Sequence, residues 1–268
     1  MLVHRNLVRS WVQWCAQDAL VLKWVTFQIA TQLPMHPRCA HLKGHGGGKQ
    51  SIATIWQQLQ SNEYQFVYRT DIRGYYQHIQ KPQVLSLVRQ WVKEPVLVNL
   101  IEQYLYYTVE DCGEFHSPEN GICRGCALSP LIGGSLLHHV DSFFASEHEL
   151  FYSRYMDDFL FLTRKRWPLR RAMKQLYVFF DMGGFERHPD KTRIGKIERG
   201  FDWLGIWFTP TETTIAPRAL NNHAERCQQA YERAVLTGAS HEDACVKVSE
   251  YKQRWNIWAT SMLPSNNG

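Results

Sequence analysis

The sequence has no stretch of about eighteen uninterrupted apolar residues, the length that a membrane-spanning helix requires. Its most apolar long stretch, residues 128–145, contains His138, His139 and Asp141. The first residues interrupt their apolar side chains too often for the core of a signal peptide. Cysteine is also sparse, with 7 residues scattered along the chain, which excludes a disulfide-stapled fold and favours a reducing compartment. We therefore expect a cytoplasmic protein that does not enter a membrane.

The sequence also lacks internal repeats and low-complexity segments, which excludes solenoids and modules joined by flexible linkers. Its 268 residues are 44% hydrophobic, enough for a substantial core. The 30 Lys and Arg against 25 Asp and Glu give a net charge of +5. This modest basic excess is compatible with a polyanionic partner. We predict one compact body with lobes.

The hydrophobic pattern predicts an α+β order of elements with a helical tail. Residues 66–72 (FVYRTDI) alternate as a strand that places Val67, Arg69 and Asp71 on one face. Residues 150–164 predict a β-hairpin with acidic residues at its turn. Residues 218–259 have a helical pattern throughout.

Three carboxylates occupy positions where strands and tight turns usually carry apolar residues: Asp71 in mid-strand, and Asp157 and Asp158 at the hairpin turn. Like charges brought together in a low-dielectric setting need neutralising cations, and oxygen ligands of this kind select Mg²⁺ or Mn²⁺. Two such ions are the apparatus of phosphoryl transfer. The alternative is a salt-bridged Asp71 and a solvated turn.

Five segments occur in an order that resembles a known family. They are Asp71-Ile72-Arg73-Gly74-Tyr75-Tyr76, residues 121–130 (GICRGCALSP), Tyr155-Met156-Asp157-Asp158, Lys191-Thr192, and residues 201–205 (FDWLG). In this order they resemble the reverse transcriptases, or RNA-directed DNA polymerases, of the bacterial group II intron and retron type. A lone tyrosine-x-Asp-Asp tetrapeptide is a weak signal, whereas the ordered set over residues 66–208 is strong.

The resemblance implies that Asp71 and Asp157 hold two ions, Mg²⁺ or Mn²⁺. The main-chain carbonyl of Ile72 would add a ligand, and Asp158 would make a looser contact. Lys191 would protonate or screen the departing pyrophosphate. The alternative for Lys191 is an ordinary surface lysine.

The resemblance also implies a nucleotide pocket. Tyr76 corresponds to the steric gate that excludes a 2′-hydroxyl, so dNTPs would be preferred. Since neighbouring strand residues face opposite ways, one of Tyr75 and Tyr76 would instead belong to the core. Arg124 and Gly125 lie in the loop that supports the incoming nucleotide, where the family usually has Pro-Gln at positions 123 and 124. The arginine would contact a nucleotide phosphate or the template.

Two segments would contact nucleic acid. Trp203, Leu204 and Gly205 resemble the turn that seats the primer end, with a buried aromatic strand as the alternative. Arg164 and Lys165 begin a basic run, residues 164–174, that could follow a phosphate backbone. The alternative for this run is a solvated helix face.

The fold that the resemblance implies is a right-hand polymerase. We expect abbreviated fingers in residues 1–66, a ferredoxin-like palm in residues 67–209 with finger-side helices at about residues 81–111, and a helical thumb in residues 210–268. Fingers this short imply that the chain works with a small lobe, that a protein partner or second copy completes it, or that the gene starts upstream.

The expected function is synthesis of DNA from dNTPs on an RNA template, starting from a DNA or RNA primer. The small size favours a domesticated bacterial role such as phage defence or an accessory of a mobile element. Two alternatives stay open: a template-independent or protein-primed nucleotidyltransferase, and a catalytically idle RNA-binding subunit of a larger complex.

Overall fold

The computed structural model describes residues 2–6 and 11–264. The strands are β1 (Leu2–Asn6), β2 (Trp11–Trp14), β3 (Phe66–Asp71), β4 (Thr108–Asp111), β5 (Glu114–His116), β6 (Leu150–Tyr155), β7 (Asp158–Thr163), β8 (Arg193–Lys196), β9 (Phe201–Trp203), β10 (Ile206–Phe208) and β11 (Thr213–Ile215). The helices are α1 (Ala16–Ile29), α2 (Gly47–Gln60), α3 (Tyr75–His78), α4 (Lys81–Trp91), α5 (Pro95–Leu105), α6 (Leu128–Leu136), α7 (His138–Ala145), α8 (Arg166–Gly183), α9 (Pro217–Leu236) and α10 (His241–Met262). Short 3₁₀ turns, η1 (Pro189–Lys191) and η2 (Ile197–Arg199), flank β8.

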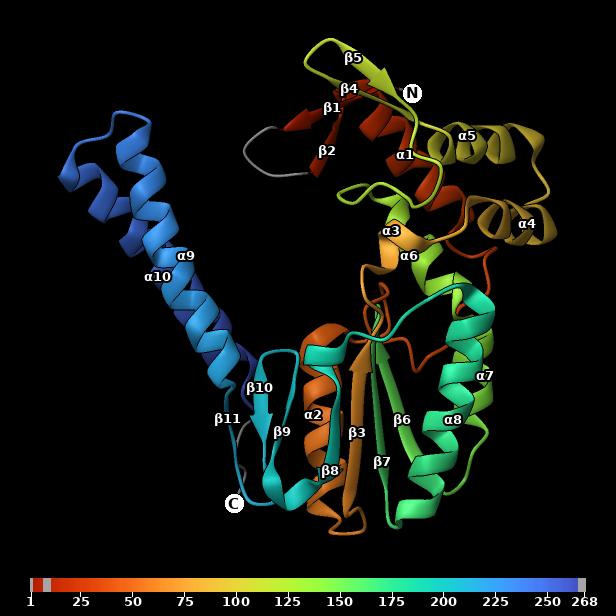
Figure 1. Ribbon diagram of the computed structural model, residues 1–268, viewed down its shortest axis with the longest axis vertical. Helices are drawn as coiled ribbons and strands as arrows, with labels where there is room; N and C mark the ends of the chain where they lie inside the picture. Colours follow the sequence, from red (N-terminus) through yellow and green to blue (C-terminus); the bar gives the residue numbers. More distant parts are fainter. Residues whose placement is uncertain (1, 7–10, 265–268) are drawn as a thin grey trace.

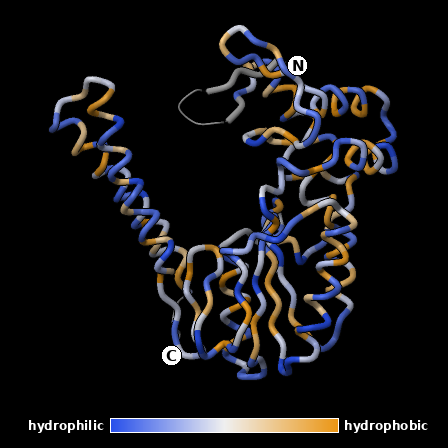
Figure 2. Tube along the Cα trace, viewed as in Figure 1, coloured by the Kyte–Doolittle hydropathy of each residue, from blue (hydrophilic) through white to orange (hydrophobic). Residues whose placement is uncertain are grey.

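The centre of the molecule is an antiparallel sheet with the strand order β6-β7-β3-β8 (Figure 1). Side chains alternate between its two faces as strand geometry requires. Tyr68, Phe159 and Phe161 belong to the core that includes side chains of α8. Val67, Leu160 and Leu162 belong to a second core with α2 and β9–β10. The predicted period of two in residues 66–72 is therefore confirmed, and hydrophobic stretches mark these strands in Figure 2.

An upper lobe stands over the end of the sheet at which β3 terminates (Figure 1). Its own sheet has the order β2-β1-β4-β5, so it joins the first strands to a hairpin about a hundred residues later in the sequence. Helix α1 packs on α5 and α6, and α4 packs on α5. The finger-side helices expected at about residues 81–111 end at Leu105, because β4 takes up Thr108–Asp111.

Helix α2 packs against the central sheet, although it lies in the segment predicted as fingers. It lies within residues 1–66, but Ile52, Ile55 and Leu59 are buried against the central sheet and not in the upper lobe. The contact with α10 further ties α2 to the carboxyl-terminal elements.

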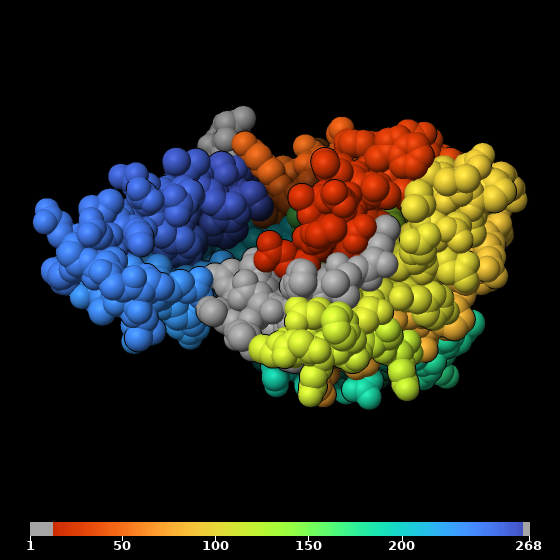
Figure 3. Space-filling view, turned by 90° about the horizontal axis from the view of Figure 1, so that it is seen from above, coloured from red at the N-terminus to blue at the C-terminus, as the bar shows by residue number. Residues whose placement is uncertain are grey.

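The carboxyl-terminal helices α9 and α10 form a helical hairpin that projects from one side of the central sheet (Figure 1). Seen from above, this hairpin (blue) stands to one side of the amino-terminal elements (Figure 3). The helical prediction for residues 218–259 holds except for a break at residues 237–240. Within the described part of the chain, no helix combines the length and apolarity needed to cross a bilayer.

The loop after β5 is fixed to α3 by its main chain. Gly121 N–H donates to the Ile79 carbonyl and Ile122 N–H to the Tyr76 carbonyl, both at 2.8 Å. Gly121 has a φ of 83°, and a Cβ there would lie 2.8 Å from the Gln77 oxygen. Gly125 has a similar φ of 82°, but a Cβ there would meet nothing within 4 Å. Substitutions at these two glycines can therefore distinguish the cost of a left-handed backbone from the cost of a steric contact.

We predict that Gly125→Ala lowers the free energy of unfolding by about 1 kcal/mol, the cost of a left-handed alanine. Gly121→Ala should cost about 2–4 kcal/mol, because the methyl group also meets backbone that cannot rotate away. Urea unfolding of both variants measures the difference. Equal losses would show that the contact between the loop and α3 is not tight.

Candidate active site

The end of β3 and the β6–β7 turn bring the three predicted carboxylates together. Asp71 lies directly opposite Asp158 in the β3–β7 register, and Tyr155 opposite Asp158 in the hairpin. Met156 and Asp157 therefore form a tight turn, and Met156 has the positive φ, 57°, that tight hairpins require at this position. Ile72 N–H donates to the Asp157 carbonyl at 3.2 Å, which fixes the turn to the end of β3.

Asp71 is the most deeply buried of the three carboxylates. Asp71 is 2% exposed, and its Oδ2 accepts a hydrogen bond from the Lys191 ammonium. Its Oδ1 is buried and has no hydrogen-bond partner among the described residues. Burial raises the pKa of Asp157, and the negative charge of Asp71 raises it further. An orphaned carboxylate oxygen beside a second crowded carboxylate fits a divalent cation, which would satisfy the first and relieve the repulsion.

Asp158 is engaged differently. Its carboxylate pairs with the Arg69 guanidinium at 2.9 Å, and Arg69 also pairs with Asp202 at 3.1 Å. Burial raises the pKa of Asp158 to about 6, while Arg69 opposes the shift. Across residues 2–6 and 11–264, no three His, Cys, Asp or Glu side chains converge as a metal cluster.

A cavity of about 640 Å³ opens beside Asp157. Its lining includes Tyr76, Arg124, Gly125, Pro130 and Met156. The predicted substrate-binding side chains therefore share one pocket with a predicted catalytic acid. The Arg124 guanidinium lies 5.9 Å from the centre of the Tyr76 ring, and Arg124 is exposed at the mouth, where it is free to meet an anion.

The structure corrects the interpretation of Tyr75 and Tyr76 as strand residues on opposite faces. Gly74, with a φ of 59°, turns the chain into α3 directly after β3. Both tyrosines are therefore buried on the same side, with Tyr75 donating to the Gly133 carbonyl at 2.7 Å and Tyr76 lining the pocket. Tyr75 thus packs in the core, while Tyr76 lines the pocket.

Comparison with known proteins decides the family. A model of the reverse transcriptase (RNA-dependent DNA polymerase) family matches residues 21–208, more than half of the chain. The chain belongs to this family. No curated protein matches its sequence. The bacterial subtype suggested by the motifs stays a prediction.

Solved structures support the same fold. Apo telomerase from Candida tropicalis truncated from its C-terminal domain has a TM-score of 0.55 and 13% identity, covering 75% of this chain and 45% of that one. Telomerase from Candida albicans with a fragment of telomeric RNA has a TM-score of 0.57 and 11% identity, covering 75% and 38%. This reverse transcriptase chain thus spans less than half of either telomerase. The predicted right-hand polymerase fold is confirmed.

The turn expected to seat the primer joins β9 to β10. Leu204 and Gly205 form it, both with positive φ. Trp203 is completely buried, and its indole N–H donates to Ser51 Oγ at 3.0 Å. The structure therefore corrects the prediction that Trp203 contacts nucleic acid directly. Trp203 is instead a buried aromatic residue of the strand, as in the alternative interpretation. The ion pairs Asp202–Arg69–Asp158 connect the turn to the catalytic hairpin.

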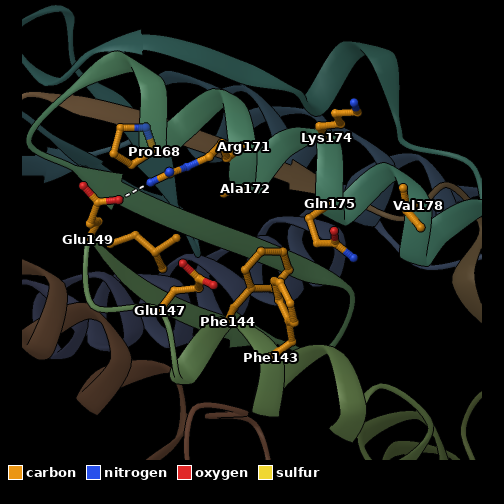
Figure 4. Close-up of a pocket in the computed structure, with 11 residues that line it drawn as sticks. Phe143, Phe144, Glu147, Glu149, Pro168, Arg171, Ala172, Lys174, Gln175 and Val178 are labelled. Carbon is orange, nitrogen blue, oxygen red and sulfur yellow. Dashed lines mark hydrogen bonds and ion pairs between the residues drawn. The ribbon is translucent and has the colours of Figure 1, made fainter.

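The basic run is not brought to this reverse transcriptase site. Arg164 follows the end of β7 opposite to Asp158 and pairs with Glu63, and Lys165 precedes α8. Further along α8, Arg171 pairs with Glu149 at a separate pocket between α7 and α8 (Figure 4). Contact of Arg164 and Lys165 with a phosphate backbone stays a prediction, and two cations of the run are already paired with acids.

Sequence reasoning missed His41 and Arg154, which both contact the Met156–Asp157 turn. His41 Nδ1 accepts the Met156 N–H at 3.0 Å, and Arg154 Nη1 donates to the Met156 carbonyl at 2.6 Å. A lone histidine in a loop carries no signal. Arg154 directly precedes the Tyr155–Asp158 motif, and its charge within a predicted strand was the one available signal. Burial lowers the pKa of His41 to about 4, Arg154 and His45 lower it too, and Asp141 and the Pro130 carbonyl oppose them.

We predict that His41 makes the folded state lose stability as the pH falls. Its folded pKa of about 4 lies below its ordinary value of 6.5, so between these values the unfolded chain binds the extra proton. At pH 5 the loss is on the order of 2 kcal/mol relative to pH 7. Urea unfolding of wild type and His41→Asn at both pH values measures it, because the other histidines titrate in both proteins. Parallel pH dependences would contradict the prediction.

Proposed function

We propose that this chain is an RNA-directed DNA polymerase that adds dNTPs to a primer 3′-hydroxyl by two-metal phosphoryl transfer. The observation that carries the proposal is the meeting of Asp71 and Asp157 beside the pocket that contains Tyr76 and Arg124. Asp157 lies in the wall of a space of nucleotide size, and a cation from the facing loop, Arg124, lies at its mouth. The Candida albicans telomerase structure contains an RNA fragment, which supports an RNA template for this chain.

The residues of the site have separate tasks in this proposal. Divalent cations held by Asp71, Asp157 and the Ile72 carbonyl would supply the hydroxyl activation and charge neutralisation that in-line transfer requires. Arg124 would bind the triphosphate, since a guanidinium matches phosphate oxygens. Lys191 contacts Asp71, so it limits repulsion between the carboxylates and can turn toward the departing pyrophosphate.

Primer extension on an RNA template, with each dNTP in turn and Mg²⁺ present, tests the proposal. Wild type should extend the primer, and Asp157→Asn should reduce the rate at least about a hundredfold, because the lost charge is needed to hold the cation. Asp181→Asn, an exposed acid on α8, is the matched control and should retain full activity. Extension that needs no template would favour the template-independent alternative, and undiminished extension by Asp157→Asn would refute the site.

Tyr76 gives a second prediction, on sugar selectivity. Tyr76→Val should raise the ratio of rNTP to dNTP incorporation at least about tenfold, because the ring no longer blocks the 2′-hydroxyl. Tyr76→Phe keeps the ring and should keep the selectivity. Competition between dNTP and rNTP in single-nucleotide extension gives the ratio. Identical ratios in the three proteins would place the sugar elsewhere in the cavity.

A further inference from the structure

A short segment before α2 lies alongside the end of β6. Arg154 N–H donates to the Arg38 carbonyl at 2.9 Å, and Ala40 N–H donates to the Arg154 carbonyl at 2.8 Å. Cys39 thus pairs with Arg154 in parallel. Two residues further along both segments, the same register places His41 beside Met156. Met156 is the first residue of the catalytic turn.

His41 supplies the next bond of this ladder with its side chain. A regular parallel ladder would send the Met156 N–H to the Ala40 carbonyl. That carbonyl instead accepts from Gly47 N–H at 3.0 Å, where α2 begins. His41 Nδ1 takes its place and accepts the Met156 N–H at 3.0 Å. Since the Arg154 guanidinium holds the Met156 carbonyl, side chains bind both polar main-chain groups of Met156.

The same two side chains reach from the turn to α6. His41 Nε2 lies 3.1 Å from the Pro130 carbonyl, and Arg154 Nη2 donates to the Gly134 carbonyl at 3.0 Å. Pro130 and Gly134 are one helical turn apart. Because His41 Nδ1 accepts from an amide, the ring proton must lie on Nε2, where it donates to Pro130. Arg154 is held in turn by Asp141, and both are fully buried.

We propose that neutral His41 is a positioning residue that fixes the catalytic turn against the wall of the nucleotide pocket. It links Met156, the neighbour of Asp157, to Pro130, and both lie in the lining of the 640 Å³ cavity. Met156 holds a left-handed backbone conformation that a residue with a side chain adopts only where its surroundings determine it. The hydrogen bonds of His41 and Arg154 hold Met156 in this conformation. The inference rests on the proposed function only for its kinetic consequence.

Three substitutions at one position separate this role from simple packing. His41→Phe fills the space without a hydrogen bond, His41→Asn presents Oδ1 where Nδ1 lies, and His41→Gln reaches toward Pro130 but not Met156. We expect the Phe and Gln variants to lose about tenfold in kcat/KM for the dNTP, with unchanged affinity for the primer–template. The Asn variant should regain most of the loss. Leu97→Ala, at a buried position on α5, is the packing control, with a lower Tm and unchanged kcat/KM.

Hydrogen exchange of the Met156 amide provides a readout that does not depend on activity. Protection should fall in His41→Phe and persist in His41→Asn. Wild-type protection and kcat/KM in the Phe variant would overturn the proposal. So would equal losses of kcat/KM in the Phe and Asn variants, if Leu97→Ala with a similar fall in Tm loses as much. If wild type extends no primer, the exchange result still decides the role of His41, whereas the failure then belongs to the proposed polymerase activity.

Discussion

The pairing of Asp71 with Asp158 across β3 and β7 is the constraint on which the site depends. It brings the end of one strand and the turn of a hairpin to the same point, and it does so by main-chain register. The cost is the burial of neighbouring carboxylates, whose mutual repulsion grows as water is excluded. The surroundings of the carboxylates offset that repulsion in two ways: with the cationic side chains of Arg69 and Lys191, and with space for a metal ion.

The fixed cations divide the acids into two groups. Arg69 lies on the same face of β3 as Asp71 and binds Asp158, and through Asp202 it extends the network to the β9–β10 turn. Lys191 occupies one oxygen of Asp71 and leaves the other without a partner among the described residues. In the proposed function, this asymmetry leaves Asp71 and Asp157 as the main residues for cation binding, with Asp158 in a supporting role.

Much of this arrangement could be predicted from the sequence because it follows from local periodicity. Alternation in residues 66–72 gave the faces of β3, and the motif of residues 155–158 gave the hairpin turn. The error at Tyr75 and Tyr76 has a local cause as well, since the left-handed Gly74 ends the strand and starts a helix within one residue. The sheet shared by β1 and β4 could not be predicted, because it joins segments about a hundred residues apart. His41 was missed for the same reason, since only the tertiary register places it at Met156.

Helix α6 contacts both the residues of the pocket and the residues that bind the Met156–Asp157 turn. Its Gly133 and Gly134 each approach neighbours so closely that a Cβ would lie 3.1 Å from Tyr75 or from Leu42. This closeness lets Tyr75 reach the Gly133 carbonyl while Arg154 reaches that of Gly134. Tyr75 and Tyr76 thus lie against the helix at Gly133. His41 and Arg154, which bind Met156, reach the helix at Pro130 and Gly134. A shift of α6 would move both groups of contacts together, so in the proposed function the packing of this one helix sets the distance between a nucleotide in the pocket and Asp157.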